Sequence, residues 1–225
     1  MIVGTYTLDA NQYANRPFRF LSGIMTDLPK FESACYPEFA SEAYGINDQG
    51  MVVGACQFTT NDGNGGESGL YDTNTNFFVF HDARSTVLAG VGDSGLAVGW
   101  FAGGTSLFNP YPARGFYVTA DGKQGFLDVP NARQTWLRGI NSAKQIAGYY
   151  DDGQHIHGFL WNPTAQSPTT LDFPGAIHTE VHGITDPNPL TVQIQIVGSY
   201  VLETDPPFTR HGFLAAPAPV VCCGP

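Results

Sequence analysis

The chain has 225 residues and a formal net charge of −10, with ten Lys and Arg against twenty Asp and Glu. So few basic residues form no stripe that could neutralise phosphates, which excludes nucleic acid as an expected partner and argues against anionic membrane surfaces. No apolar run is long enough to span a bilayer, and no signal peptide is visible in this chain.

Four short phrases recur in the same order along the chain. Each is rich in β-branched and aromatic residues and is bounded by Gly, Asn, Asp or Pro, which is the pattern of a β-strand. The first phrase begins at Gly45, Gly90, Gly139 and Gly183, which are 45, 49 and 44 residues apart. Four strands in about 45 residues is the size of one propeller blade. We therefore predict an all-β fold, a β-propeller of about five blades with four antiparallel strands each.

In chain order, residues 1–29 supply the second, third and fourth phrases without the first. Three complete copies follow, and the last copy, from Gly183 to Leu214, supplies only the first three phrases. We expect one domain over residues 1–215 and a C-terminal tail over residues 216–225.

Both terminal blades are thus expected to lack a strand, and two explanations stay open. The five blades could close into a ring, with Val220-Val221-Cys222 partly filling a gap. Alternatively, a neighbouring chain could donate the missing strand, which would give an oligomer or a filament.

The segments between the second and third phrases vary most between copies. In a propeller these loops fall on one face, where recognition often takes place. They carry aromatic residues beside carboxylates, so they form a candidate ligand face, unless they are only solvated hairpin tips. The candidate ligand-binding residues are Tyr13, Asp62, Phe108, Tyr111, Asp151, Asp152 and Phe208.

Histidines gather in the fourth copy, but we expect no metal and no cofactor. His155 and His157 are two residues apart and so share one face of a strand, and His178 and His182 follow nearby. These four are weak candidates for a transition-metal site. The competing interpretation is structural, because His211 matches His157 in the repeat.

Carboxylates at repeated positions do not predict an enzyme. A catalytic acid is needed once, whereas a residue that recurs in every copy usually holds a turn through local hydrogen bonds. No nucleophile elbow, P-loop or dinucleotide fingerprint is present. The repeated carboxylates are Asp27, Asp128 and Asp172 in the fourth phrase, and Asp48, Asp93 and Asp186 after the first.

The clearest copy of the repeat resembles the HAF-repeat family of extracellular, β-propeller-like bacterial proteins. The resemblance rests on Gly139-Ile140-Asn141 with Ile146-Ala147-Gly148-Tyr149, then His157-Gly158-Phe159-Leu160, then Leu171-Asp172-Phe173-Pro174. The family is named for a His-Ala-Phe triplet, and here glycine replaces the alanine. The resemblance covers nearly the whole chain and implies secretion, but it carries no catalytic motif.

Four cysteines, Cys35, Cys56, Cys222 and Cys223, are candidates for disulfides in an extracellular protein. Cys35 and Cys56 could crosslink. Cys222 and Cys223 could pair with each other, with the first blade or with another subunit.

We therefore expect a secreted structural or interaction protein of the cell surface or extracellular matrix, which could assemble with itself through its incomplete terminal blades. The alternatives are a carbohydrate-binding propeller and, less favoured, a glycosidase. A cell-surface or carbohydrate ligand is the other partner we consider.

Overall fold

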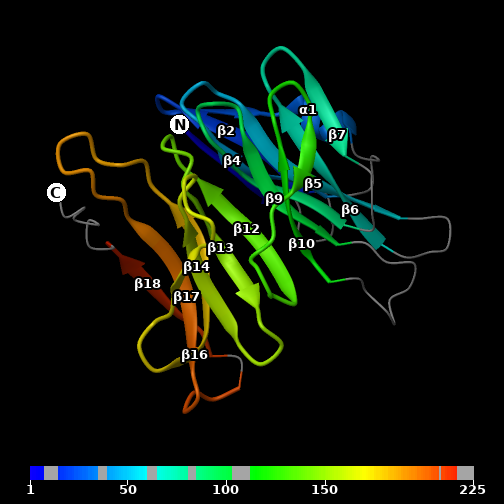
Figure 1. The fold of residues 1–225 in the computed structure, drawn as a ribbon. Coiled ribbons are helices and arrows are strands. Elements are labelled where there is room, and N and C mark those ends of the chain that lie inside the picture. The colour runs from blue at the N-terminus through cyan, green and yellow to red at the C-terminus, as the bar shows by residue number, and fades with distance from the viewer. Residues whose placement is uncertain are drawn as a thin grey trace.

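The computed structural model describes residues 1–7, 15–34, 40–59, 65–80, 85–102, 112–207 and 209–216. The fold is all-β, as predicted, with one short helix in the described part of the chain (Figure 1). None of the described helices is long and apolar enough to cross a membrane.

The elements are, in chain order, β1 (Ile2–Thr7), β2 (Asn15–Leu21), β3 (Ile24–Asp27), α1 (Pro29–Ala34), β4 (Ser41–Ile46), β5 (Val52–Thr59), β6 (Gly65–Asp72), β7 (Phe77–Phe80), β8 (Ser85–Val91), β9 (Ala97–Ala102), β10 (Arg114–Val118), β11 (Gln124–Phe126), β12 (Gln134–Ile140), β13 (Ile146–Asp151), β14 (Ile156–Trp161), β15 (Thr169–Leu171), β16 (Ala176–Ile184), β17 (Ile196–Leu202) and β18 (His211–Ala215).

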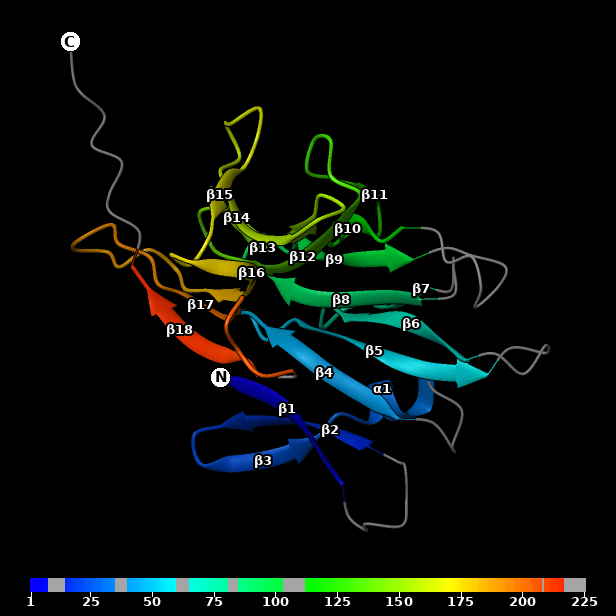
Figure 2. The ribbon, with the colours of Figure 1, turned by 90° about the horizontal axis from the view of Figure 1, so that it is seen from below.

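Antiparallel pairing between chain neighbours groups these strands into five units. Units one to five are β1–β3, β4–β7, β8–β11, β12–β15 and β16–β18. Single parallel bridges, Glu67 to Ser85 and Ile156 to His178, join units two and three and units four and five into two larger sheets. In Figure 2 the five units follow one another around a common centre.

A bulge recurs at one place in the first strand of units two to five. The register shifts across Tyr44, Ala89, Arg138 and His182, each of which precedes the glycine of the first phrase. A glycine in the second strand lies opposite the residue before each bulge. A Cβ atom at Gly99 would lie 1.8 Å from the carbonyl oxygen of Val87. The repeated glycine is therefore needed for close approach of two backbones.

Apolar side chains fill the spaces between successive units, in four separate clusters. Between units two and three, Val53 and Tyr71 pack with Leu88, Ala97 and Phe116, all of which are buried. Equivalent clusters lie at the other three junctions. The core is thus a series of unit-to-unit junctions and not one central mass.

Two elements differ from expectation. The helix α1 was not predicted; it joins units one and two, and its Phe31 is buried against Phe77 at 5.7 Å between ring centroids. The Leu-Asp-x-Pro phrases also lie mostly beyond the fourth strands, since β15 ends at Leu171. Asp172 and Pro174 therefore form the turn that leaves the strand.

Candidate functional site

The last unit exposes a position that is buried in units two, three and four. Val53, Val98 and Ala147 occupy the same place in the register of β5, β9 and β13, and all three are fully buried. Val197 is their counterpart in β17, and 45% of its surface is exposed. Leu214, on the neighbouring strand β18, is 65% exposed.

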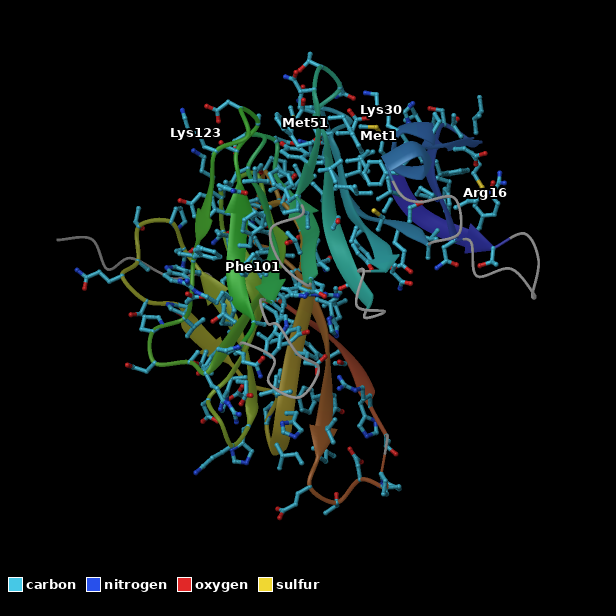
Figure 3. All side chains as sticks on the ribbon, turned by 90° about the vertical axis from the view of Figure 1, so that its right-hand side faces the viewer. Met1, Arg16, Lys30, Met51, Phe101 and Lys123 are labelled. Carbon is cyan, nitrogen blue, oxygen red and sulfur yellow. The ribbon has the colours of Figure 1, made fainter. Side chains whose placement is uncertain are left out.

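The first unit exposes the complementary position. Ile2 of β1 is 59% exposed, whereas its counterparts in β5, β9, β13 and β17 are buried: Val52, Ala97, Ile146 and Ile196. The β2–β3 hairpin also exposes Phe20, Leu21, Ile24 and Met25. Figures 1 and 3 show the two terminal units apart, with Met1 and Arg16 marking the first in Figure 3.

We call these two surfaces the first face (Ile2, Phe20 and Met25, which are cross-strand neighbours on one side of β1–β3) and the last face (Val197 and Leu214, which are cross-strand neighbours in β17 and β18). At each internal junction, the counterparts of Val197 and Ile2 lie in one core cluster. The pairs are Val3 with Val52, Val53 with Ala97, Val98 with Ile146, and Ala147 with Ile196. Val197 and Ile2 are the two halves of a fifth pair that the chain leaves open.

The ends of β4, β8, β12 and β16 meet around a pocket of about 140 Å³. Carboxylate oxygens of Asp48, Asp93 and Asp186 lie within 4.8 Å of one another there, and Ser142 occupies the corresponding place in unit four. Asp93 accepts the backbone N–H of Asp48 at 3.1 Å, and Asp186 accepts that of Ser142 at 2.6 Å. These carboxylates therefore link neighbouring units, and the local turn bonds we expected for them are not what the structure shows.

The asparagine of the Gly-Ile-Asn phrase also links neighbouring units through its side chain. The side-chain oxygen of Asn47 accepts the N–H groups of Gln49 and Met51, which closes its own turn. Its amide nitrogen donates to the carbonyl oxygen of Gly92 in the next unit at 2.9 Å. Asn141 repeats this arrangement with Thr185. One side chain both forms the hairpin and ties two units together.

The bulge residues form a second group that the sequence analysis missed. Arg138 lies with its guanidinium 4.9 Å from the ring centroid of Trp100, and in the described residues its Nε has no hydrogen-bond partner. Burial raises the pKa of Tyr44 and Tyr149, and burial with nearby Arg138 lowers the pKa of His182. The sequence signal was the polar or aromatic residue before the first-phrase glycine in three of the four copies, Tyr44, Arg138 and His182; the second of the four has Ala89.

Most of the predicted ligand face lies outside the described residues. This holds for Tyr13, Asp62, Phe108, Tyr111 and Phe208. Asp151 and Asp152 lie at the tip of the β13–β14 hairpin, where both carboxylates accept backbone N–H groups of the turn. Asp151 also accepts the side-chain amide of Gln134 at 3.2 Å.

The cysteine pairing stays a prediction. Cys56 is buried in β5. Cys35, Cys222 and Cys223 lie outside the described residues.

Two of the four predicted histidines come together with Asp152 at that hairpin tip. Ligand atoms of Asp152, His155 and His157 all lie within 4.8 Å of one another. His157 lies between two carboxylates, with Nδ1 2.8 Å from Asp172 and Nε2 3.3 Å from Asp152. Partial burial opposes its charged form, but the hydrogen bonds and charges of Asp172 and Asp152 outweigh burial and raise the pKa of His157.

The other two histidines have different partners. His178 accepts the backbone N–H of Ile156 on its Nδ1 at 3.1 Å. His182 lies at the bulge of β16, where its Nε2 is 3.0 Å from the hydroxyl of Ser199. His182 Nε2 also lies 3.7 Å from Glu180, so His155 and His157 are the two histidines that share the cluster with Asp152.

No protein-family model matches the chain, and no curated protein matches it. The resemblance to the HAF-repeat family therefore stays a prediction. What the chain does has to be argued from its own geometry.

Proposed function

We propose that the chain is a secreted structural or interaction protein that assembles head to tail with copies of itself, the last face of one copy packing on the first face of the next. We further propose that its five units are the blades of a propeller-like array. One observation carries the proposal: Val197 and Ile2 are exposed halves of a pair that is buried at three internal junctions and partly buried at the first, where Val3 packs with Val52.

The internal junctions supply the argument for a second copy as the occupant. At each internal junction, the position of Val197 in one unit packs against the position of Ile2 in the following unit. The two terminal faces therefore present different and complementary halves of this contact. Complementary, unlike faces generate head-to-tail association, which either closes into a ring or continues as a filament. Neighbouring exposed apolar side chains are typical of interaction sites. Burying their apolar surface favours association by about 25 cal/mol per Å².

The glycine of the first unit, Gly4, has a different steric surrounding from its counterparts in the other units. Gly54, Gly99, Gly148 and Gly198 each face a backbone carbonyl of a first strand within about 2 Å of where a Cβ would be. At Gly4, in contrast, the nearest atoms belong to the ring of Phe18. A Cβ at Gly4 would lie 2.9 Å from the ring of Phe18, so packing within the first unit accounts for this glycine and it does not bear on assembly.

The test is light scattering of the purified protein across a range of concentrations, coupled to size-exclusion chromatography. The wild-type mass should rise with concentration. Val197→Asp should abolish this rise, because it places a charge in the buried pair. Ile2→Asp should do the same from the other face. Leu190→Asp is the matched control, since Leu190 is exposed in unit five but lies outside both faces.

A wild-type mass that stays monomeric at every concentration would overturn the proposal, and would leave closure of the two faces within one chain. Retention of assembly in both face variants would overturn it as well. Leu214→Asp, at a 65% exposed site on the last face, provides a second variant should Val197→Asp lower the melting temperature.

A further inference from the structure

We propose that Asp152, His155 and His157, at the tip of the β13–β14 hairpin, bind a divalent transition-metal ion. The site is distinct from the two terminal faces, so it is independent of the assembly proposed above. Two imidazoles and one carboxylate are a common ligand set for such ions.

The spacing of the ligand atoms fits a metal ion. All three residues offer a ligand atom within 4.8 Å of the others. The Oδ2 atom of Asp152 lies 3.3 Å from Nε2 of His157. Two ligands at about 2.0–2.1 Å from a tetrahedral zinc ion are separated by about 3.4 Å. A small movement of the exposed His155 ring would complete the third position.

Neighbouring hydrogen bonds already orient two of the three ligands. Oδ1 of Asp152 accepts the N–H groups of Gln154 at 2.7 Å and His155 at 2.8 Å, which leaves Oδ2 for an ion. Nδ1 of His157 lies 2.8 Å from Oδ2 of Asp172. Such a carboxylate behind a histidine fixes the ring and raises the basicity of its other nitrogen, as in many metal sites.

A cation between Nε2 of His157 and Oδ2 of Asp152 would also reduce the repulsion between these two atoms. When Nδ1–H of His157 donates to Asp172, the lone pair of Nε2 points toward the carboxylate oxygen of Asp152. Two electron-rich atoms at this distance repel each other unless a positive charge lies between them. A proton on Nε2 removes this repulsion in the protonated ring, and a metal ion bound to both atoms removes it in the neutral ring.

Unit five contains a natural comparison. His211 occupies the place of His157, and its Nε2 lies 3.1 Å from Oδ1 of Asp205. The place of His155 is taken by Thr209, so unit five has the histidine–aspartate pair without the third ligand. The repeat alone therefore accounts for one pair, and only unit four adds what a metal ion needs.

The ligand set also indicates which ions fit. Imidazole nitrogen suits zinc, cobalt, nickel and copper, whereas magnesium and calcium prefer oxygen ligands. His178 is not a fourth ligand in this arrangement, because its Nδ1 accepts the N–H of Ile156 and its Nε2 then carries the proton. Water would fill the remaining positions of the exposed site.

The experiment is calorimetric titration of the full chain with zinc chloride, alongside thermal unfolding with and without the salt. We expect one saturable site, and a rise of the melting temperature with zinc because the ion binds the folded hairpin. His155→Ala and His157→Ala should each weaken zinc binding at least about tenfold, and Asp172→Asn by about tenfold. His211→Ala is the matched control and should leave zinc binding unchanged. Magnesium chloride in place of zinc chloride should give no comparable saturable binding, because magnesium prefers oxygen ligands.

Cobalt distinguishes this site from the thiols of the chain. Cobalt bound to nitrogen and oxygen ligands should give weak visible bands that disappear in His157→Ala, without the strong near-ultraviolet band of a cobalt–thiolate bond. Zinc binding that persists undiminished in both His155→Ala and His157→Ala would overturn the proposal. So would a thiolate band in the cobalt spectrum that accounts for all of the bound metal, or the absence of saturable binding.

Discussion

At the scale of single residues, a glycine in the second strand of units two to five lets two backbones meet beside a bulge. The close contact is between main-chain atoms, so it cannot be relieved by a side-chain rotation. A carbonyl oxygen faces the missing Cβ in all four units, from 1.8 Å at Gly99 to 2.2 Å at Gly198. The glycine is thus a steric requirement of the bulged pairing.

Gly99→Ala should therefore destabilise the protein by about 2 kcal/mol or more, because the strands must separate to accept the methyl group. Gly212→Ala is the control, since the nearest atom to its Cβ would be 4.0 Å away. Urea unfolding of the two variants measures the difference. Equal free energies of unfolding would show that the close approach is not a constraint.

Two threonines at equivalent positions make a matched pair. Thr86 and Thr135 are both buried at the same place in β8 and β12. Thr135 accepts the N–H of Val129 at 3.0 Å, whereas Thr86 Oγ1 has no hydrogen-bond partner in the described structure. Unit two lacks the Leu-Asp-x-Pro turn that supplies the donor in units three and four.

Thr135→Val should cost about 1–3 kcal/mol, because it leaves a buried N–H unpaired. Thr86→Val should be neutral or stabilising, because it removes a buried hydroxyl that gains nothing. Differential scanning calorimetry of the two isosteric variants compares them. A larger loss from Thr86→Val than from Thr135→Val would contradict this account.

At the scale of elements, β4 and β6 bring two carboxylates together beside Tyr44. Burial, and then the charge of Glu42, raise the pKa of Glu67 above its ordinary 4.5, against a smaller opposing effect of the hydrogen bond to Ser85. Tyr44 donates a hydrogen bond to Glu42. The folded state therefore holds the Glu67 proton more tightly than the unfolded state does.

Stability linked to Glu67 should rise as the pH falls through its raised pKa toward 4.5, since the folded state binds more protons there. Glu67→Gln should remove this part of the pH dependence and should be more stable than the wild type at neutral pH. Glu203→Gln, at an exposed turn residue, is the control. The free energy of unfolding measured from pH 4 to 8 provides the test, and parallel curves for wild type and Glu67→Gln would contradict it.

Strand phrases and their order were readable from the sequence because β-branched residues, glycines and turn residues act locally. The helix α1 was not, since it is six residues long and is held by the burial of Phe31 against another unit. The spacing of two residues along a strand predicted that His155 and His157 lie on the same face. It did not reveal Asp172, which reaches His157 through the pairing of β14 with β15.

A comparison between the repeat copies could have predicted the contact between His157 and Asp172. Arg114 stands in unit three where His157 stands in unit four, and it bonds Asp128 as His157 bonds Asp172. A basic residue before the third-phrase glycine thus pairs with the fourth-phrase aspartate in both units. The roles of Asp93 and Asp186, which line the pocket, were harder to interpret from the sequence, because their hydrogen-bond partners lie about 45 residues away in the preceding unit.

At the scale of the whole molecule, the same apolar pair packs at four internal junctions, and its two halves are exposed at the terminal units. Consecutive units form this contact within one chain, whereas Val197 of the last unit and Ile2 of the first unit stay exposed. Assembly then needs no new type of interface. It repeats between copies the packing that already holds each copy together.

The most direct measurement mixes two variants that cannot assemble alone. Ile2→Asp keeps an intact last face, and Val197→Asp keeps an intact first face. Head-to-tail packing predicts that each is a monomer by light scattering, and that an equimolar mixture forms a heterodimer and nothing larger. A mixture that remains monomeric while the wild type assembles, or variants that assemble on their own, would contradict the account.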